Sequence, residues 1–164
     1  MPGKLLNYTT EIAAEKTVAE IQRKLAQAGA SQVLHGYDAH GNLSELSFRI
    51  KTQFGEMAFR LPANIEAVEA ILTRQFKSGR SRFASREHAT KVAWRILKDW
   101  VEAQLALLQT GMVTIEQAFL PYAQNNNGQT VYEALCEKRF CRDVDEQVRV
   151  AGSHLLHQTQ RWTP

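Results

Sequence analysis

The stretch LSFRIKTQFGEMAFRL, residues 46–61, decides the fold because it has the pattern of two strands joined by a tight turn. Apolar and polar side chains alternate in both halves, as they do in strands with one buried face. A turn at residues 54–55 would place Ile50 opposite Phe59, and a slip of one residue would mix the two faces. We therefore predict an antiparallel hairpin with one apolar and one polar face.

The polar face of this hairpin concentrates positive charge. The predicted register sets Arg49 directly opposite Arg60, with Lys51 beside them. Like charges that face each other across a sheet are destabilising. Two explanations are open: nearby carboxylates neutralise the arginines, or the pair forms a seat for an anionic partner. The candidate carboxylates are Glu11, Glu45 and Glu56.

The segments around the hairpin predict helices on one side of an antiparallel sheet. Tyrosine and threonine make residues 5–12 a candidate first strand. Thr17 and Glu20 have the spacing of a capping box ahead of an apolar helical stripe. Another strand is expected over residues 32–37, and Asn64 is placed to cap the helix after the hairpin. The predicted order is β-α-β-β-β-α, which is an α+β fold.

The C-terminal half is predicted to be helical, with the N-terminal sheet packed against it. Ser85 is placed to cap one long helix that ends near Gly111, because apolar residues recur between them at 3–4 spacing. Capping boxes that begin at Thr114 and Thr130 predict two further helices, the first of them short.

The chain of 164 residues is long enough to bury the core of one domain. We expect a single α+β domain over residues 1–140. After that point the apolar pattern weakens, so residues 141–164 are expected to form a loosely attached, partly helical segment.

The composition is typical of a soluble cytoplasmic protein, with a formal net charge of +3 and 44% hydrophobic residues. No apolar run is long enough to cross a membrane, and the N-terminus lacks the apolar stretch of a secretory signal. Cys136 and Cys141 are therefore expected to be free thiols in a reducing compartment.

No catalytic or cofactor-binding motif stands out. The sequence contains no G-x-S-x-G, no Walker A motif and no G-x-G-x-x-G. His154 and His157 are the one close pair of histidines, and they are interpreted as surface residues rather than metal ligands. We expect no cofactor and no catalytic residue, although an active site assembled from distant residues is left open.

Positive charge is also concentrated between residues 74 and 98, where only one acid occurs. Phe83 and Trp94 are interleaved with these cations. Cations that meet phosphates and rings that stack on bases suit a nucleic acid. The alternative is that the rings anchor to the core and the cations form an ordinary soluble surface. Three of the cations share one face of the long helix: Lys91, Arg95 and Lys98.

Three segments carry a family resemblance: YTTEIAAEKTVAEIQRKLAQAGA, FRLPANIEAV and VAWRILKDWVEAQLALLQTGMVTIEQAFLPYAQNNNGQTVYEAL. Together they resemble a family of small uncharacterised proteins of bacteriophages and integrated mobile elements. The resemblance covers residues 8 to about 137 and implies an accessory role in a bacterial cytoplasm. No activity is established for that family, so it carries over no catalytic residue.

These observations predict a small non-enzymatic accessory protein that binds nucleic acid without sequence preference, single-stranded DNA included. The alternative is a protein-binding accessory factor that acts on a host or phage protein; an enzyme ranks third. The predicted contact residues are Arg49, Lys51, Arg60, Lys77, Arg80, Arg82, Phe83, Arg86, Lys91, Trp94, Arg95 and Lys98.

Overall fold

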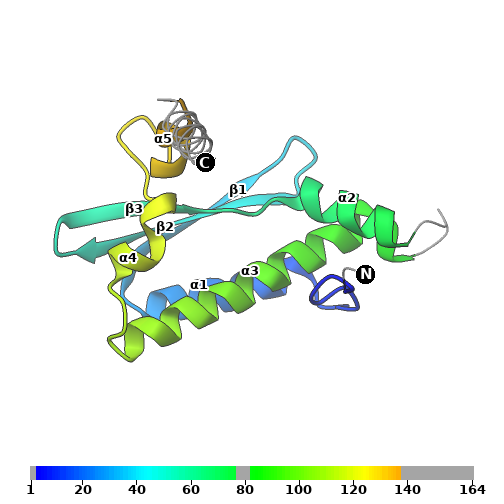
Figure 1. Ribbon diagram of the computed structural model, residues 1–164, viewed down its shortest axis with the longest axis horizontal. Helices are drawn as coiled ribbons and strands as arrows, with labels where there is room; N and C mark the ends of the chain where they lie inside the picture. Colours follow the sequence, from blue (N-terminus) through cyan, green and yellow to red (C-terminus); the bar gives the residue numbers. More distant parts are fainter. Residues whose placement is uncertain (1–2, 77–81, 138–164) are drawn as a thin grey trace, which may run out of the picture.

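Three antiparallel strands pack over two long helices in the computed structural model, which describes residues 3–76 and 82–137 (Figure 1). Helices α1 and α3 lie side by side under the inner face of the sheet, and α5 lies beyond its outer face (Figure 1). The predicted mixture of helices and an antiparallel sheet is confirmed, whereas the predicted segment 141–164 lies outside the described residues. The elements are α1 (Ala14–Gln27), β1 (Ala30–Tyr37), β2 (Leu43–Thr52), β3 (Gly55–Leu61), α2 (Ile65–Gln75), η1 (Arg82–Ala84), α3 (Arg86–Gln109), α4 (Ile115–Phe119), η2 (Leu120–Tyr122) and α5 (Val131–Glu137).

The predicted first strand over residues 5–12 is wrong, because these residues form turns ahead of α1. The backbone N–H of Tyr8 donates to the Leu5 carbonyl at 3.2 Å. The Tyr8 ring stacks on Phe76 with the ring centroids 5.5 Å apart. Ring packing therefore overrides a local preference for strand, and the order up to α2 is α-β-β-β-α.

The predicted capping box at Thr17 and Glu20 is also wrong, because helix α1 begins before it. Its N-cap is Ala13, so Thr17 lies inside the helix and is fully buried. The Thr17 hydroxyl donates back to the Ala13 carbonyl at 3.3 Å. Glu20 is thus free of any capping role and is turned toward α3.

The hairpin has the predicted faces but not the predicted register. Phe48 lies opposite Phe59, which is a shift of two residues, and the turn falls at residues 53–54. A shift of two keeps every side chain on its face, so alternation cannot detect it. The observed register stacks the Phe48 and Phe59 rings at 5.2 Å and sets Arg49 opposite Ala58. The predicted opposition of Arg49 and Arg60 is therefore wrong.

The core lies between the inner face of the sheet and the two long helices. The rings of Phe48, Phe59 and Phe119 interlock with centroids 5.2 to 6.0 Å apart. Trp100 meets Phe119 edge-on at 5.3 Å. The buried part of the predicted apolar stripe on α3 is Ala89, Val92, Ala93, Leu97, Val101 and Leu105.

Most of the predicted helix caps are confirmed. Asn64 accepts a hydrogen bond from the backbone of α2, and Ser85 does the same for α3. Thr114 forms a reciprocal capping box with Gln117, and Thr130 forms the equivalent pair of bonds with a glutamate at the start of α5. Among the described residues, no helix is long and apolar enough to cross a membrane.

Candidate functional site

Most of the predicted nucleic-acid contacts that the structure describes already have carboxylate partners. The Lys91 ammonium lies 2.8 Å from a Glu87 carboxylate oxygen, as expected for an i, i+4 pair. Lys98 and Glu102 form a second i, i+4 pair, at 2.7 Å. The remaining pairs join segments distant in sequence: Arg60 with Glu133, Arg82 with Glu11, Arg86 with Glu66 and Glu69, and Arg95 with Glu20. Lys77 and Arg80 lie outside the described residues.

Two cations of α3, Arg95 and Lys98, lie beside α1 rather than in open solvent. Arg95 lies 2.7 Å from Glu20, and its side chain is only 18% exposed. Lys98 is 14% exposed and lies 2.7 Å from Glu102, which also binds Lys24 at 2.8 Å. These five residues form a charge seam between the two helices, so Arg95 and Lys98 do not belong to a solvated face.

The seam favours the charged forms of Lys98 and Glu102. The hydrogen bond that Lys98 donates to Glu102 raises the pKa of Lys98 despite partial burial. Burial tends to raise the pKa of Glu102, but hydrogen bonds from Lys24 and Lys98 outweigh that effect and lower it. Lys98 and Glu102 each stabilise the charged form of the other, and the ion pairs of Lys98 and Arg95 leave these two cations little capacity for an external phosphate.

The two predicted stacking residues are engaged in the fold. Trp94 is 0% exposed, so it cannot stack on a base, and the prediction for it is wrong. Its position in the helix turns the ring into the protein, among the apolar residues beneath the sheet. Phe83 packs against Phe76 and His88, with both centroid distances at 5.1 Å. Here the alternative interpretation, in which the rings anchor the chain to the core, describes the structure.

Arg49 and Lys51 lie on the outer face of the sheet, whereas α3 lies under the inner face. The predicted cations therefore do not form one surface. Within the described residues, neither side chain has a hydrogen-bond or ion-pair partner, whereas Arg60 on the same face is bound by Glu133. Glu133 was not among the carboxylates that the sequence suggested. Arg49 lines a pocket of about 480 Å³ together with Glu56, Met57, Ala58, Gln124, Asn125, Asn126 and Gly128.

The part of the chain that the structure describes is not basic. It contains 13 lysine and arginine residues against 14 aspartate and glutamate residues, a formal net charge of −1. The positive excess of the whole sequence is therefore carried by residues 77–81 and 138–164.

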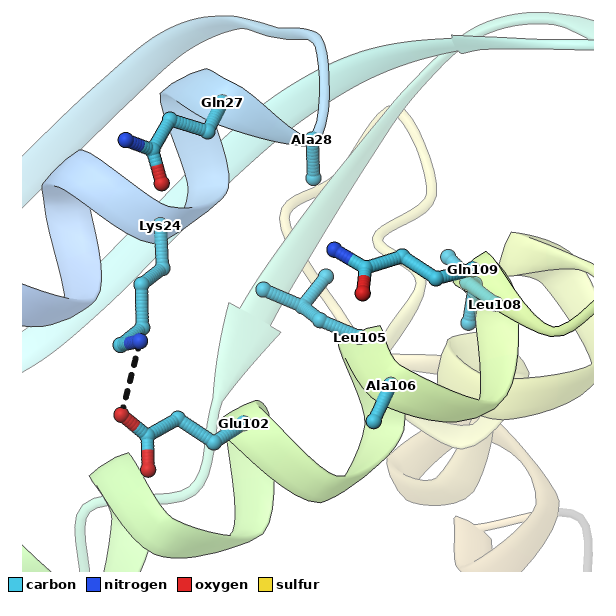
Figure 2. Close-up of a pocket in the computed structure, with 8 residues that line it drawn as sticks. All are labelled: Lys24, Gln27, Ala28, Glu102, Leu105, Ala106, Leu108 and Gln109. Atoms are coloured by element: carbon cyan, nitrogen blue, oxygen red, sulfur yellow. Dashed lines mark ion pairs between the residues drawn. The ribbon is translucent and has the colours of Figure 1, made fainter.

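A cleft with a volume of about 550 Å³ lies between the C-terminal parts of α1 and α3. In Figure 2 the ion pair between Lys24 and Glu102 closes one end, and Leu105 projects between the helices. The side-chain amides of Gln27 and Gln109 flank the apolar centre (Figure 2). The other lining residues are Ala28, Ala106 and Leu108.

Sequence reasoning missed this cleft because it depends on how two helices lie against each other. The small residues Ala28 and Ala106 leave the space open, but alanine is common in helices and gives no warning of a groove. Of the lining residues, only Leu105 and Leu108 belong to the apolar 3–4 pattern that predicts the long helix.

Of the close histidine pair and the two cysteines, only Cys136 lies in the described residues. No group of three or more His, Cys, Asp or Glu side chains in residues 3–76 and 82–137 is arranged to hold a metal ion. His154, His157 and Cys141 lie outside these ranges, and Cys136 is a free, exposed thiol.

Comparisons with protein-family models, with curated proteins and with solved structures find no match to this chain. The resemblance to phage and mobile-element proteins therefore stays a prediction.

Proposed function

We propose that the protein is a non-enzymatic, protein-binding accessory protein whose partner docks in the cleft between α1 and α3. The single observation that carries this proposal is the chemistry of the cleft. Its apolar centre is accessible, while the charges at its rim are already paired with each other. Such a site favours an apolar side chain over a phosphate.

The rim of the cleft supplies the polar contacts that a protein partner needs. The amides of Gln27 and Gln109 make no hydrogen bond within the described residues. Each amide can donate and accept, so each suits a peptide group or another amide. An apolar side chain of the partner that enters between the two amides would displace water from Leu108. Main-chain groups of the partner beside that side chain could then form hydrogen bonds with the two amides.

Nucleic-acid binding through the predicted residues has less support. A phosphate at the charge seam must compete with Glu20 and Glu102 for cations that are largely buried. One observation favours nucleic-acid binding as a second candidate function. On the outer face of the sheet, the side chains of Arg49 and Lys51 have no hydrogen-bond or ion-pair partner among the described residues. Any phosphate contact is therefore proposed for that face and not for α3.

The test fills the cleft without disturbing the core. Ala106 is exposed and lines the cleft, so Ala106→Trp should occupy the space that a partner needs. Ala103→Trp is the matched control, because Ala103 is exposed on the same helix but does not line the cleft. Affinity purification from bacterial lysate should yield a protein that the wild type and Ala103→Trp retain and Ala106→Trp loses.

A parallel titration with a fluorescent oligonucleotide separates the two candidates. Contacts to several phosphates give a log K that falls by ~0.7–0.9 per contact against log salt. Two results together would favour the nucleic-acid proposal over the protein-binding one. The oligonucleotide would bind in a salt-dependent way to both the wild type and Ala106→Trp, and the affinity purification would retain no partner protein.

A further inference from the structure

The two edges of the sheet differ in how they are covered. At the β3 edge, the backbone N–H of Gln124 donates to the Ala58 carbonyl at 2.8 Å, and Ala123 pairs with Phe59. At the β1 edge, no described residue adds a backbone partner on the side away from β2. An uncovered edge presents free N–H and C=O groups that can pair with another strand.

Strand β1 lacks the charges that usually protect an open edge. Its sequence, ASQVLHGY, contains no lysine, arginine, acid or proline, although these residues commonly blunt exposed edges. Leu34 is 58% exposed and Tyr37 is 62% exposed. Irregular pairing near Ala30 and again near Tyr37 leaves a regular stretch from Gln32 to Gly36. This stretch is available for pairing along its whole length.

The composition of β1 suits a second copy of the same strand. Across a two-fold axis each residue near the axis meets itself or a close neighbour, so any charge there would face a like charge. A neutral strand meets no such penalty. Antiparallel pairing also requires opposed residues to lie on the same face of the sheet, which allows Leu34 to lie opposite Leu34 of the other copy.

Val33 and Leu34 point to opposite faces, since Val33 pairs with buried Phe48 and Leu34 with Ser47 on the outer face. A register centred on Leu34 covers the most exposed apolar side chain of the regular stretch in both copies. It also places Gln32 opposite Gly36, where no side chain competes for space. Assembly stops at two copies because the β3 edge is covered.

We infer that the protein forms a two-fold symmetric dimer through antiparallel pairing of its β1 edges, with Leu34 opposite Leu34 at the axis, to give one continuous six-stranded sheet. This surface is separate from the cleft of the proposed function.

Light scattering after size-exclusion chromatography should give twice the 18.6 kDa mass of one chain. Leu34→Lys places two ammonium groups face to face and should return the mass to that of one chain, with an unchanged circular dichroism spectrum. Phe54→Lys is the control: Phe54 is 77% exposed at the hairpin turn, away from the β1 edge, so this variant should stay dimeric. A wild type that stays monomeric across a concentration series, or a dimeric Leu34→Lys, would overturn the inference.

Cysteine cross-linking tests the register. In a chain with Cys136→Ser and Cys141→Ser, Leu34→Cys should give a disulfide-linked dimer on mild oxidation, because directly opposed Cβ atoms lie ~4.5–5.5 Å apart. Gln32→Cys lies on the same strand and face, but its two copies are offset by four residues, or ~13 Å at the rise of a strand. It should therefore not cross-link. Equal cross-linking of both variants would overturn the proposed pairing.

Discussion

The charge seam between α1 and α3 makes a quantitative prediction for Arg95→Gln. Arg95 donates to Glu20 at 2.7 Å, and the two side chains are 18% and 24% exposed. Exposed pairs are worth ~0.2–1 kcal/mol, whereas removing one partner of a fully buried pair costs ~3–5 kcal/mol. This pair lies between the two limits, so we expect Arg95→Gln to lower the free energy of unfolding by about 2 kcal/mol.

Urea denaturation followed by far-UV circular dichroism measures this loss. For a chain of this size the corresponding fall in Tm is ~4–8 °C, from ~2–4 °C per kcal/mol. A double-mutant cycle with Glu20→Gln should give a coupling energy of about 1 kcal/mol, because residues in direct contact do not act additively. Glu20→Gln keeps the length of the side chain, whereas Arg95→Gln shortens it, so the control must make the same replacement.

Arg23→Gln is the matched control on α1. Arg23 is exposed and has no ion-pair partner among the described residues, so its replacement should change stability by no more than about 0.5 kcal/mol. If Arg95→Gln and Arg23→Gln behave alike, the seam contributes nothing and the reasoning from burial fails. The face of α3 would then be the solvated surface that the sequence suggested.

Two further predictions address the core and the pH dependence. Phe119→Ala should lower the free energy of unfolding by ~3–5 kcal/mol in urea titrations, because its buried ring contacts three other rings; a loss below 1 kcal/mol would contradict this. Hydrogen bonds from the Thr130 backbone and from Arg60 lower the pKa of Glu133, so its stabilising contribution is present above the ordinary glutamate pKa of ~4.3 and is lost as pH falls through the lowered value. The stability difference between wild type and Glu133→Gln should therefore be largest near neutral pH and vanish in acid, and a pH-independent difference would disprove the linkage.

Local signals in the sequence predicted a good part of the fold. The caps at Asn64, Ser85 and Thr114 were predictable because a cap and its partner lie within three residues of each other. The length of α3 was predictable from the apolar 3–4 spacing between the cap at Ser85 and the stop near Gly111. The two faces of the hairpin were equally clear, since alternation depends only on neighbouring residues.

The hairpin register and the N-terminal turns needed information from further away. A shift of two residues leaves alternation unchanged, so the register depends on which side chains meet, and stacking Phe48 on Phe59 decides it. Residues 5–12 have the composition of a strand, but their backbone conformation follows the place of the Tyr8 ring beside Phe76 and Phe83. Neither contact can be read from sequence spacing.

The partners of the predicted nucleic-acid contacts could not be predicted, for a related reason. A count of charges along residues 74–98 finds many cations and one acid, but acids that neutralise them come from other segments. Glu11 precedes α1, Glu20 lies in α1, and Glu66 and Glu69 lie in α2. A run of like charge therefore says little about a surface until the neighbouring elements are placed.

The cations of the charge seam have a structural role that requires no ligand. Along α1, Glu20 faces Arg95 and Lys24 faces Glu102, so the two contacts have opposite polarity. Sliding α1 by one turn would put Lys24 where Glu20 lies, opposite Arg95, and like charges would meet in a largely buried position. Apolar packing between two helices tolerates such a slide better than paired charges do. The seam therefore sets the axial position of α1 on α3, and with it the place at which Ala28 and Ala106 leave the cleft open.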